Sequence, residues 1–267
     1  MEGNILDQLA DFARVRVHKE QEETSLDVMR EKAWQAAQDT PEEQRFLFEK
    51  ALSGPGIHFI CECKKASPSK GLIAPKFPYL EIARDYEAAG ASAISCLTEP
   101  KWFLGKNEYL KEIAETVSIP VLRKDFTVDP YMIYEAKVLG ASAVLIICAL
   151  LDAETIHRWI GICDTLGLSA LVEAHDEREV QMAADAGARI IGVNNRNLKD
   201  FTVDIHNAGR LRHFAPEGTI FVAESGIKTR DDVRALEADG VNAVLIGEQL
   251  MRAENRQAEL KKLRGVS

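Results

Sequence analysis

The feature that most constrains the fold of this chain is a short phrase that recurs four times. Its copies read AGASAISCL, LGASAVLII, AGARIIGVN and DGVNAVLIG, each with a glycine followed by a largely apolar run. These glycines, Gly90, Gly140, Gly187 and Gly240, lie 50, 47 and 53 residues apart. A strand–helix unit takes roughly 25–30 residues, so each interval has room for two units. Each phrase is typical of a helix end, a glycine turn and a buried strand.

Four more segments with the composition of buried strands lie outside these phrases. They are HFICECK at 58–64, IPVLRKD at 119–125, LSALVEA at 168–174 and TIFVAES at 219–225. Segments with apolar residues at helical spacing, such as 79–90 and 153–167, separate the strands. Eight alternating strand–helix units predict an α/β fold, a (β/α)8 TIM barrel. An open doubly wound sheet is the weaker alternative, because no strand is followed by a G-x-G-x-x-G turn.

The first 56 residues do not fit this repeat. Ile5, Leu6, Leu9 and Phe12 give an apolar helical face among many charges. We predict one domain over residues 1–267, with an extra N-terminal helical segment at 1–56 and the barrel at 57–267. The extra helices would cap the floor or rim of the barrel, or help to close its active site.

Charge and cysteine content narrow the classes of function. Lys and Arg total 33 against 42 Asp and Glu, and the net charge of −9 argues against non-specific nucleic-acid binding. Five cysteines without a Cys-x-x-Cys pair suggest neither a disulfide framework nor a zinc ribbon. The N-terminus lacks a secretory signal, and the longest apolar run, 141–151, is shorter than the about 20 residues that cross a bilayer. We expect a reduced, cytoplasmic protein without membrane or nucleic-acid partners, monomeric or a weak homo-oligomer, that acts on a small anionic molecule.

Polar side chains interrupt the predicted strands at their C-terminal ends, where barrel active sites lie. In the first strand Glu62 and Lys64 share a face with Ile60, because alternate residues point the same way. Polar residues also end four further strands, namely Lys124, Glu173, Asn194 and the pair Glu224-Ser225. Glu and Lys are rarely buried unless paired, so this set indicates either a salt-bridge network or an active site at one mouth.

Two glycine turns predict a site for a phosphate group. Gly226 follows the seventh strand and Gly247 the eighth, each ahead of a predicted helix whose free N–H groups attract an anion. Glu248 would contribute its backbone N–H with its side chain turned away. Ser67, in the SPSKG loop that follows the first strand, would add a hydroxyl. The alternative is that these glycines only make turns. No metal site is predicted, since the six histidines show no ligand spacing.

The order and spacing of these residues resemble the indole-3-glycerol phosphate synthase family from residue 59 to residue 251. The specific motifs are Glu62-x-Lys64-x-x-Ser67-Pro68-Ser69-x-Gly71 and Lys124-Asp125-Phe126. They are accompanied by Leu97-Thr98-Glu99 with Phe103, Glu173, Gly192-Val193-Asn194-Asn195-Arg196-Asn197-Leu198 and Ala223-Glu224-Ser225-Gly226. The N-terminal part looks more loosely like the extra helical segment of that family.

The resemblance implies a carboxy-lyase of tryptophan biosynthesis. Such an enzyme converts 1-(2-carboxyphenylamino)-1-deoxyribulose 5-phosphate to indole-3-glycerol phosphate, carbon dioxide and water. No cofactor is implied, because rearomatisation of the ring drives the decarboxylation.

The resemblance also implies a role for each site residue. Lys124 would be the general acid of ring closure, Glu173 the base or a hydroxyl contact, and Lys64 the partner of the substrate carboxylate and an acid in dehydration. Glu62 would pair with a lysine and hold a hydroxyl. The remaining residues would bind substrate: Asn194 and Ser225 at its hydroxyls, Arg196 at its carboxylate or as a brace for Glu62, and Phe103, Phe126, Leu145, Leu198 and Leu245 against the anthranilate ring. Ser67, Glu224, Gly226, Gly247 and Glu248 complete the predicted binding site.

Two other functions fit the same barrel. One is a Schiff-base aldolase with Lys124 or Lys64 as the nucleophile. The other is a non-catalytic barrel that only binds a sugar phosphate, and the intact acid–base positions argue against it.

Overall fold

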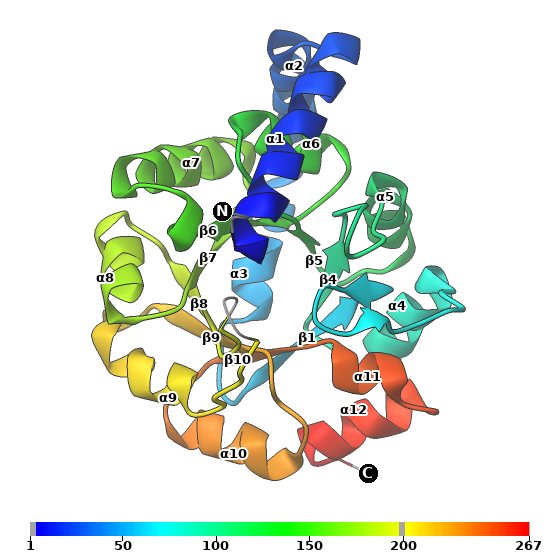
Figure 1. Cartoon of the computed structure of the whole chain (residues 1–267), viewed down its shortest axis with the longest axis vertical. Helices are drawn as coiled ribbons and strands as arrows, with labels where there is room; N and C mark the ends of the chain where they lie inside the picture. The colour runs from blue at the N-terminus through cyan, green and yellow to red at the C-terminus, as the bar shows by residue number, and fades with distance from the viewer. Residues whose placement is uncertain (1–3, 198–200, 267) are drawn as a thin grey trace.

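Eight parallel strands close into a barrel in the computed structural model, which describes residues 4–197 and 201–266. Around the ring the order is β1-β10-β9-β8-β7-β6-β5-β4, so the first strand pairs with the last, Phe59 opposite Val244 (Figure 1). The strands are β1 (His58–Cys63), β4 (Ala93–Leu97), β5 (Val121–Lys124), β6 (Ala143–Ile147), β7 (Ser169–Ala174), β8 (Ile190–Asn194), β9 (Ile220–Glu224) and β10 (Ala243–Ile246). The predicted (β/α)8 TIM barrel is confirmed.

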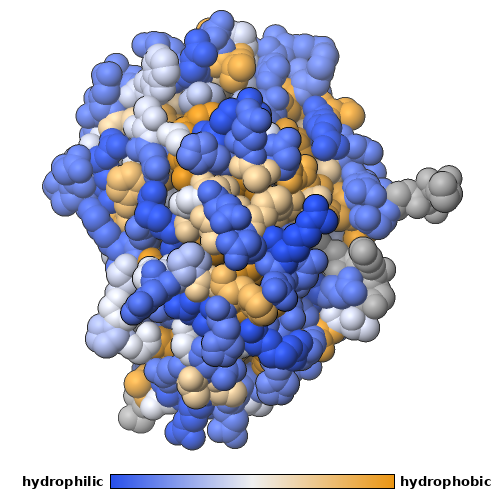
Figure 2. Space-filling view, turned by 90° about the vertical axis from the view of Figure 1, so that its left-hand side faces the viewer, coloured by the Kyte–Doolittle hydropathy of each residue, from blue (hydrophilic) through white to orange (hydrophobic). Residues whose placement is uncertain are grey.

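Helices surround the strands as an outer ring (Figure 1). They are α4 (Tyr79–Ala88), α5 (Asn107–Thr116), α6 (Pro130–Val138), α7 (Ala153–Leu166), α8 (Glu177–Asp185), α9 (Asn207–Leu211), α10 (Arg230–Ala238), α11 (Glu248–Arg252) and α12 (Arg256–Arg264), with 3-10 turns η2 (Cys148–Leu150) and η3 (Arg212–Phe214). Figure 2 shows the side of this ring, where mainly hydrophilic residues face outward and hydrophobic ones gather in smaller patches. No helix within the described residues is long and apolar enough to cross a membrane.

The recurring glycines have the same backbone conformation in all four phrases. Gly90, Gly140, Gly187 and Gly240 have φ of 87°, 84°, 89° and 80°, a left-handed conformation that ends a helix and that other residues adopt only with strain. Each glycine therefore turns the chain from a helix into the next barrel strand.

One small two-stranded sheet was not predicted from the sequence. Strands β2 (Ala66–Ser67) and β3 (Gly71–Leu72) form an antiparallel pair in the loop after β1. Two residues are too few to show the alternation by which a strand is recognised. This hairpin lies in the SPSKG segment, at the mouth of the barrel.

The N-terminal segment reaches both ends of the barrel. It contains α1 (Ile5–Glu23), α2 (Leu26–Gln38), the 3-10 turn η1 (Glu42–Gln44) and α3 (Leu47–Ala51). Phe48 and Leu52 are fully buried among inward-facing residues such as Ala143 and Ile190, which begin their strands, so α3 fills the floor. In Figure 1 α3 accordingly lies in the centre of the ring, whereas α2 packs on α6 outside it. That residues 1–267 form one domain stays a prediction, and the burial of Phe48 supports it.

A substitution at the floor tests this dependence. Phe48→Ala should lower the free energy of unfolding by about 3–5 kcal/mol, because it removes a buried aromatic ring and leaves a cavity. Val15→Ala, on the exposed side of α1, should stay within about 0.5 kcal/mol of the parent chain. Urea denaturation followed by circular dichroism measures both. If Phe48→Ala unfolds at the same urea concentration as the parent chain, α3 does not support the barrel.

Candidate active site

The polar strand ends converge on one cavity of about 700 Å³ at the mouth of the barrel. Every predicted site residue among the described residues lines it. These residues are Glu62, Lys64, Ser67, Phe103, Lys124, Phe126, Leu145, Glu173, Asn194, Arg196, Glu224, Ser225, Gly226, Leu245, Gly247 and Glu248. Leu198, predicted to contact the anthranilate ring, lies outside the described residues.

Lys124, at the end of β5, occupies the centre of this site. Its Nζ lies 3.0 Å from Glu173 Oε2 on β7 and 3.3 Å from Glu224 Oε2 on β9. Burial alone would lower the pKa of Lys124, but the carboxylates of Glu173, Glu224 and Glu62 outweigh it and raise that pKa. The ammonium group is therefore firmly protonated before any substrate binds.

The two carboxylates beside Lys124 differ in their ionisation. Burial would raise the pKa of Glu173, yet Lys124 and His175, together with a hydrogen bond from Asn194, lower it. Glu224 shares Lys124, but Glu224 Oε1 has no hydrogen-bond partner in the described part of the chain. Burial, aided by the nearby charge of Glu173, raises the pKa of Glu224 to about 7. Glu173 is thus ionised at neutral pH, while Glu224 is partly protonated.

A second cation, Lys64, faces the cavity just after β1 and pairs with Glu62. Glu62 was predicted to pair with a lysine and to be braced by Arg196. Its ionic partner is Lys64, whereas Arg196 Nη1 donates to Phe201 O at 3.5 Å.

Two glycines leave room for the carboxylates of the site. A Cβ at Gly247 would collide with the Glu62 carboxylate and the Lys64 ammonium, and one at Gly192 with the Glu224 carboxylate.

The two predicted phosphate loops follow the neighbouring strands β9 and β10, and both line the cavity. Ser225 and Gly226 both have left-handed backbone, with φ of 70° and 85°, and α10 begins only four residues later at Arg230. Helix α11 starts directly after Gly247. The Glu248 side chain is neutralised rather than simply turned away, because it lies 3.7 Å from Lys70 Nζ and 3.1 Å from Arg252 Nε.

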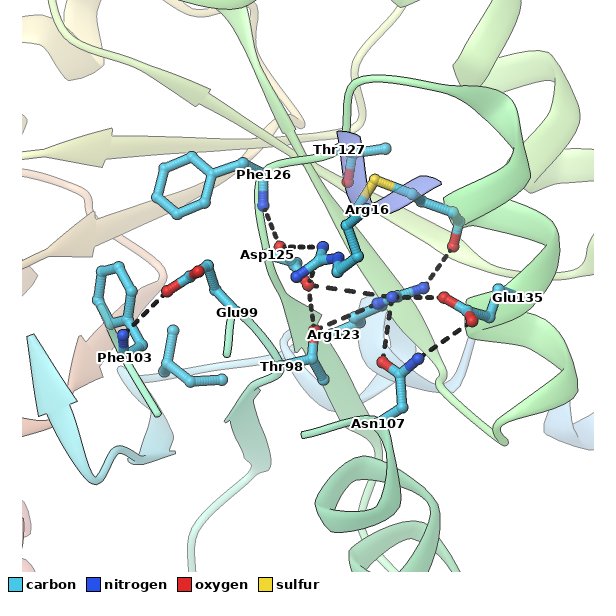
Figure 3. Close-up of polar contacts among 12 residues, drawn as sticks. Arg16, Thr98, Glu99, Phe103, Asn107, Arg123, Asp125, Phe126, Thr127 and Glu135 are labelled. Atoms are coloured by element: carbon cyan, nitrogen blue, oxygen red, sulfur yellow. Dashed lines mark hydrogen bonds and ion pairs between the residues drawn. The ribbon is translucent and has the colours of Figure 1, made fainter. Parts of the chain in front are cut away.

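Apolar side chains also line the cavity. The rings of Phe103 and Phe126 lie 6.0 Å apart, and Leu145 on β6 and Leu245 on β10 line the same space. Ile5 and Leu9 on α1 also line this cavity, which the sequence did not predict by residue. Glu99 holds the loop that carries Phe103 by accepting its backbone N–H at 2.9 Å (Figure 3).

Behind Lys124, a buried polar network fixes the strand end (Figure 3). Asp125 accepts two hydrogen bonds from Arg16 on α1, at 2.9 and 2.8 Å, and one from Thr98 Oγ1 at 2.5 Å. Arg123 points away from the cavity, as strand alternation predicts, and pairs with Glu135 on α6 at 2.6 Å. Burial would raise the pKa of Asp125, but Arg16 and Arg123 lower it.

Two polar residues near this site were missed by the sequence analysis. Arg16 is separated from Asp125 by 109 positions and belongs to a segment outside the repeat, so no local pattern joins them. His175 was considered only as one of six histidines without the spacing of metal ligands. Its Nε2 lies 3.4 Å from Glu173 Oε1, and only its position two residues after Glu173 could have signalled this contact.

Comparison with known proteins agrees with this geometry. The sequence model of the indole-3-glycerol phosphate synthase family matches residues 6–263. Indole-3-glycerol phosphate synthase of Ruminiclostridium cellulolyticum is 57% identical over 261 residues, covering 98% of this chain and 99% of that protein. That of Endomicrobium trichonymphae is 51% identical over 261 residues, covering 97% and 99%.

Among solved structures, 3-hexulose-6-phosphate synthase superimposes with a TM-score of 0.63. The similarity covers 79% of this chain and all of that one at 15% identity, so it speaks for the barrel fold alone. The family match spans the extra helices, the barrel and all the motifs of the mouth. The chain therefore belongs to the indole-3-glycerol phosphate synthase family.

Proposed function

We propose that this chain converts 1-(2-carboxyphenylamino)-1-deoxyribulose 5-phosphate to indole-3-glycerol phosphate in the cavity at the barrel mouth. The observation that carries the proposal is the Lys124 ammonium, held between Glu173 and Glu224 in the cavity that the rings of Phe103 and Phe126 also line. A proton donor, a carboxylate and an apolar surface for a flat ring thus face one space, as the reaction requires.

Lys124 is the general acid of ring closure. As the ring carbon that bears the carboxylate attacks the ribulose carbonyl, negative charge develops on the carbonyl oxygen, and Lys124 donates its proton there. A lysine enclosed by carboxylates is always in the protonated form that this step needs. It releases the proton only when comparable negative charge appears on the substrate.

The later steps use the residues around Lys124. Breaking the bond to the carboxyl group returns its electron pair to the ring and restores aromaticity, with Lys64 holding the carboxylate until it leaves as carbon dioxide. Dehydration then needs an acid for the departing hydroxyl, Lys64, and a base for the proton on the neighbouring ring carbon, Glu173. Asn194 and Ser225 orient hydroxyls, and Glu62 holds Lys64 in place.

The same geometry disfavours the Schiff-base aldolase. An imine-forming lysine must lose its proton to become a nucleophile, which is why such lysines have lowered pKa values. The pKa of Lys124 is raised instead, by the carboxylates of three strands. Borohydride added during turnover should therefore leave the mass of the chain unchanged.

We also propose that the enzyme acts in the cytoplasm as a monomer or weak homo-oligomer. The five cysteines are buried free thiols, as suits a reducing compartment, and one chain supplies the described residues of the cavity. The net charge of −9 fits a small-molecule substrate better than a nucleic acid.

Product formation tests the function directly. The purified chain, dialysed against EDTA, should make indole-3-glycerol phosphate at the same rate as the untreated chain, because the proposed steps use only protein acids and bases. The indole absorbance of the product reports the rate. A loss of rate that added metal restores would contradict a metal-independent mechanism, and no product in either sample would contradict the function.

Replacing Lys124 tests its role as the acid. Lys124→Ala should lower turnover by about 10²–10⁴-fold, the usual contribution of a general acid, with a smaller change in KM. Lys111→Ala, an exposed lysine on α5, is the control and should keep parental turnover. Near-normal turnover in a Lys124→Ala chain that is folded by circular dichroism would place the acid elsewhere, with Lys64 the next candidate.

The phosphate loops are tested without a substitution, because a side chain at Gly247 would also displace Glu62. In the chain labelled with ¹⁵N-glycine, inorganic phosphate should shift the amide signals of Gly226 and Gly247, whose N–H groups would contact the anion. Gly161, in the middle of α7, is the internal control. If the signals of Gly226 and Gly247 move no more than that of Gly161, the phosphate binds elsewhere.

A further inference from the structure

His175 lies directly behind Glu173 and has no part in the steps described above. Its imidazole ring stands between two carboxylates, with Nδ1 3.0 Å from Glu179 Oε2 and Nε2 3.4 Å from Glu173 Oε1. Its side chain is about one-fifth exposed, whereas that of Glu173 is almost fully buried. His175 does not line the cavity, so it would act on a substrate only through Glu173.

The contacts of Glu179 fix which nitrogen of His175 carries a proton. Glu179 Oε2 accepts the backbone N–H of His175 at 2.8 Å and faces Nδ1 of the same residue. An ionised carboxylate can only accept, so Nδ1 must carry a proton. In the neutral ring, Nε2 would then turn a lone pair toward an oxygen of Glu173, which is repulsive. A second proton, on Nε2, makes this contact an attractive ion pair.

The surroundings of His175 favour this second proton. Burial would lower the pKa of His175, but the hydrogen bond to Glu179 and the charges of Glu173 and Glu224 raise it. Nε2 is buried and makes no hydrogen bond within the described residues, so its interaction with Glu173 is one of charge. The charged groups that act on the ring are Glu179 on α8, Glu173 on β7 and Glu224 on β9. Lys124 on β5 acts in turn on Glu173, and Cys148 on η2 lies near Glu179, Glu173 and Asp176.

We propose that His175 is a positioning residue that, as an imidazolium held by Glu179, keeps Glu173 ionised and aligned as the base. The inference rests on the proposed role of Glu173 in dehydration. Lys124 supplies one positive charge to Glu173 from the cavity side, and His175 supplies a second from behind. The second charge stays in place when Lys124 gives up its proton in ring closure.

This arrangement predicts a specific change in the pH profile. Positive charge beside Glu173 lowers its pKa, so removing that charge raises it, and the base is lost at a higher pH as the solution is acidified. An opposite charge at this distance shifts a carboxyl pKa by about one unit or more. His175→Gln, which keeps an amide but cannot ionise, should therefore move the acid limb of kcat upward by about one pH unit. On that limb kcat falls about tenfold at a given pH, while KM changes little.

Two further variants separate this role from a structural one. Glu179→Gln keeps an acceptor for the His175 backbone N–H but removes the negative charge, so it should move the limb in the same direction by a smaller amount. His18→Gln is the matched control, since His18 also faces a glutamate four residues on, Glu22, at 3.5 Å, but on the surface of α1. It should leave the profile unchanged. If His175 only shapes the start of α8, thermal melting will change and the limb will not.

A measurement without turnover completes the test. In the chain labelled with ¹⁵N-histidine, the signal of His175, identified by its loss in His175→Gln, should titrate above the ordinary value of about 6.5. Its neutral form should carry the proton on Nδ1. Glu173→Gln and Glu179→Gln should each move the titration to lower pH. The inference would be overturned if His175 titrated at the ordinary value in the parent, Glu173→Gln and Glu179→Gln chains alike. An unshifted acid limb of kcat in an active His175→Gln chain would also overturn it. Failure of the parent chain to make product would instead overturn the proposed function.

Discussion

Lys124 can keep its charge inside the barrel mouth only because carboxylates from β7 and β9 face it. At about 4 Å and an effective dielectric of about 20, one such pair is worth on the order of 4 kcal/mol. Burial of an unpaired ion would cost at least as much, so the lysine and its carboxylates must be kept together. Glu62, Glu173 and Glu224 outnumber Lys64 and Lys124, and partial protonation of Glu224 reduces the excess negative charge. The mouth thereby repels a substrate that carries a phosphate and a carboxylate less strongly.

Three successive residues at the end of β5 have three different surroundings. Arg123 faces outward to Glu135 on α6, Lys124 faces the cavity, and Asp125 meets Arg16 from α1. Arg123 and Asp125, on either side of Lys124, each form an ion pair with a different helix, so the end of β5 has little freedom to rotate. Helix α1 thereby stabilises the position of the ammonium group through Asp125, and α3 supports the same barrel from its floor.

Most of the barrel could be predicted from the sequence because its signals are local. Gly90 and its three counterparts mark the turn into every second barrel strand, and alternation alone separates Arg123 from Lys124. The convergence of Glu62, Lys124 and Glu173 also follows from fold class, since parallel strands in a barrel end at one mouth. Partnerships between distant segments could not be predicted. Arg16 with Asp125 and Phe48 in the floor depend on packing that leaves no periodic trace in the sequence.

The burial of α3 has a consequence for how the chain is made. Phe48 and Leu52 leave the ribosome before any of the strands that will enclose them, and the ring closes only when β10 pairs with β1. Synthesis at about 5–20 residues per second puts tens of seconds, at the slower rates, between these two events. Throughout that interval the aromatic side chain of Phe48 and the aliphatic side chain of Leu52 lack part of the enclosure that the complete barrel floor gives them. A chaperone could therefore bind the nascent chain at these two side chains. Their enclosure is complete only when β10, the last strand to be synthesised, pairs with β1.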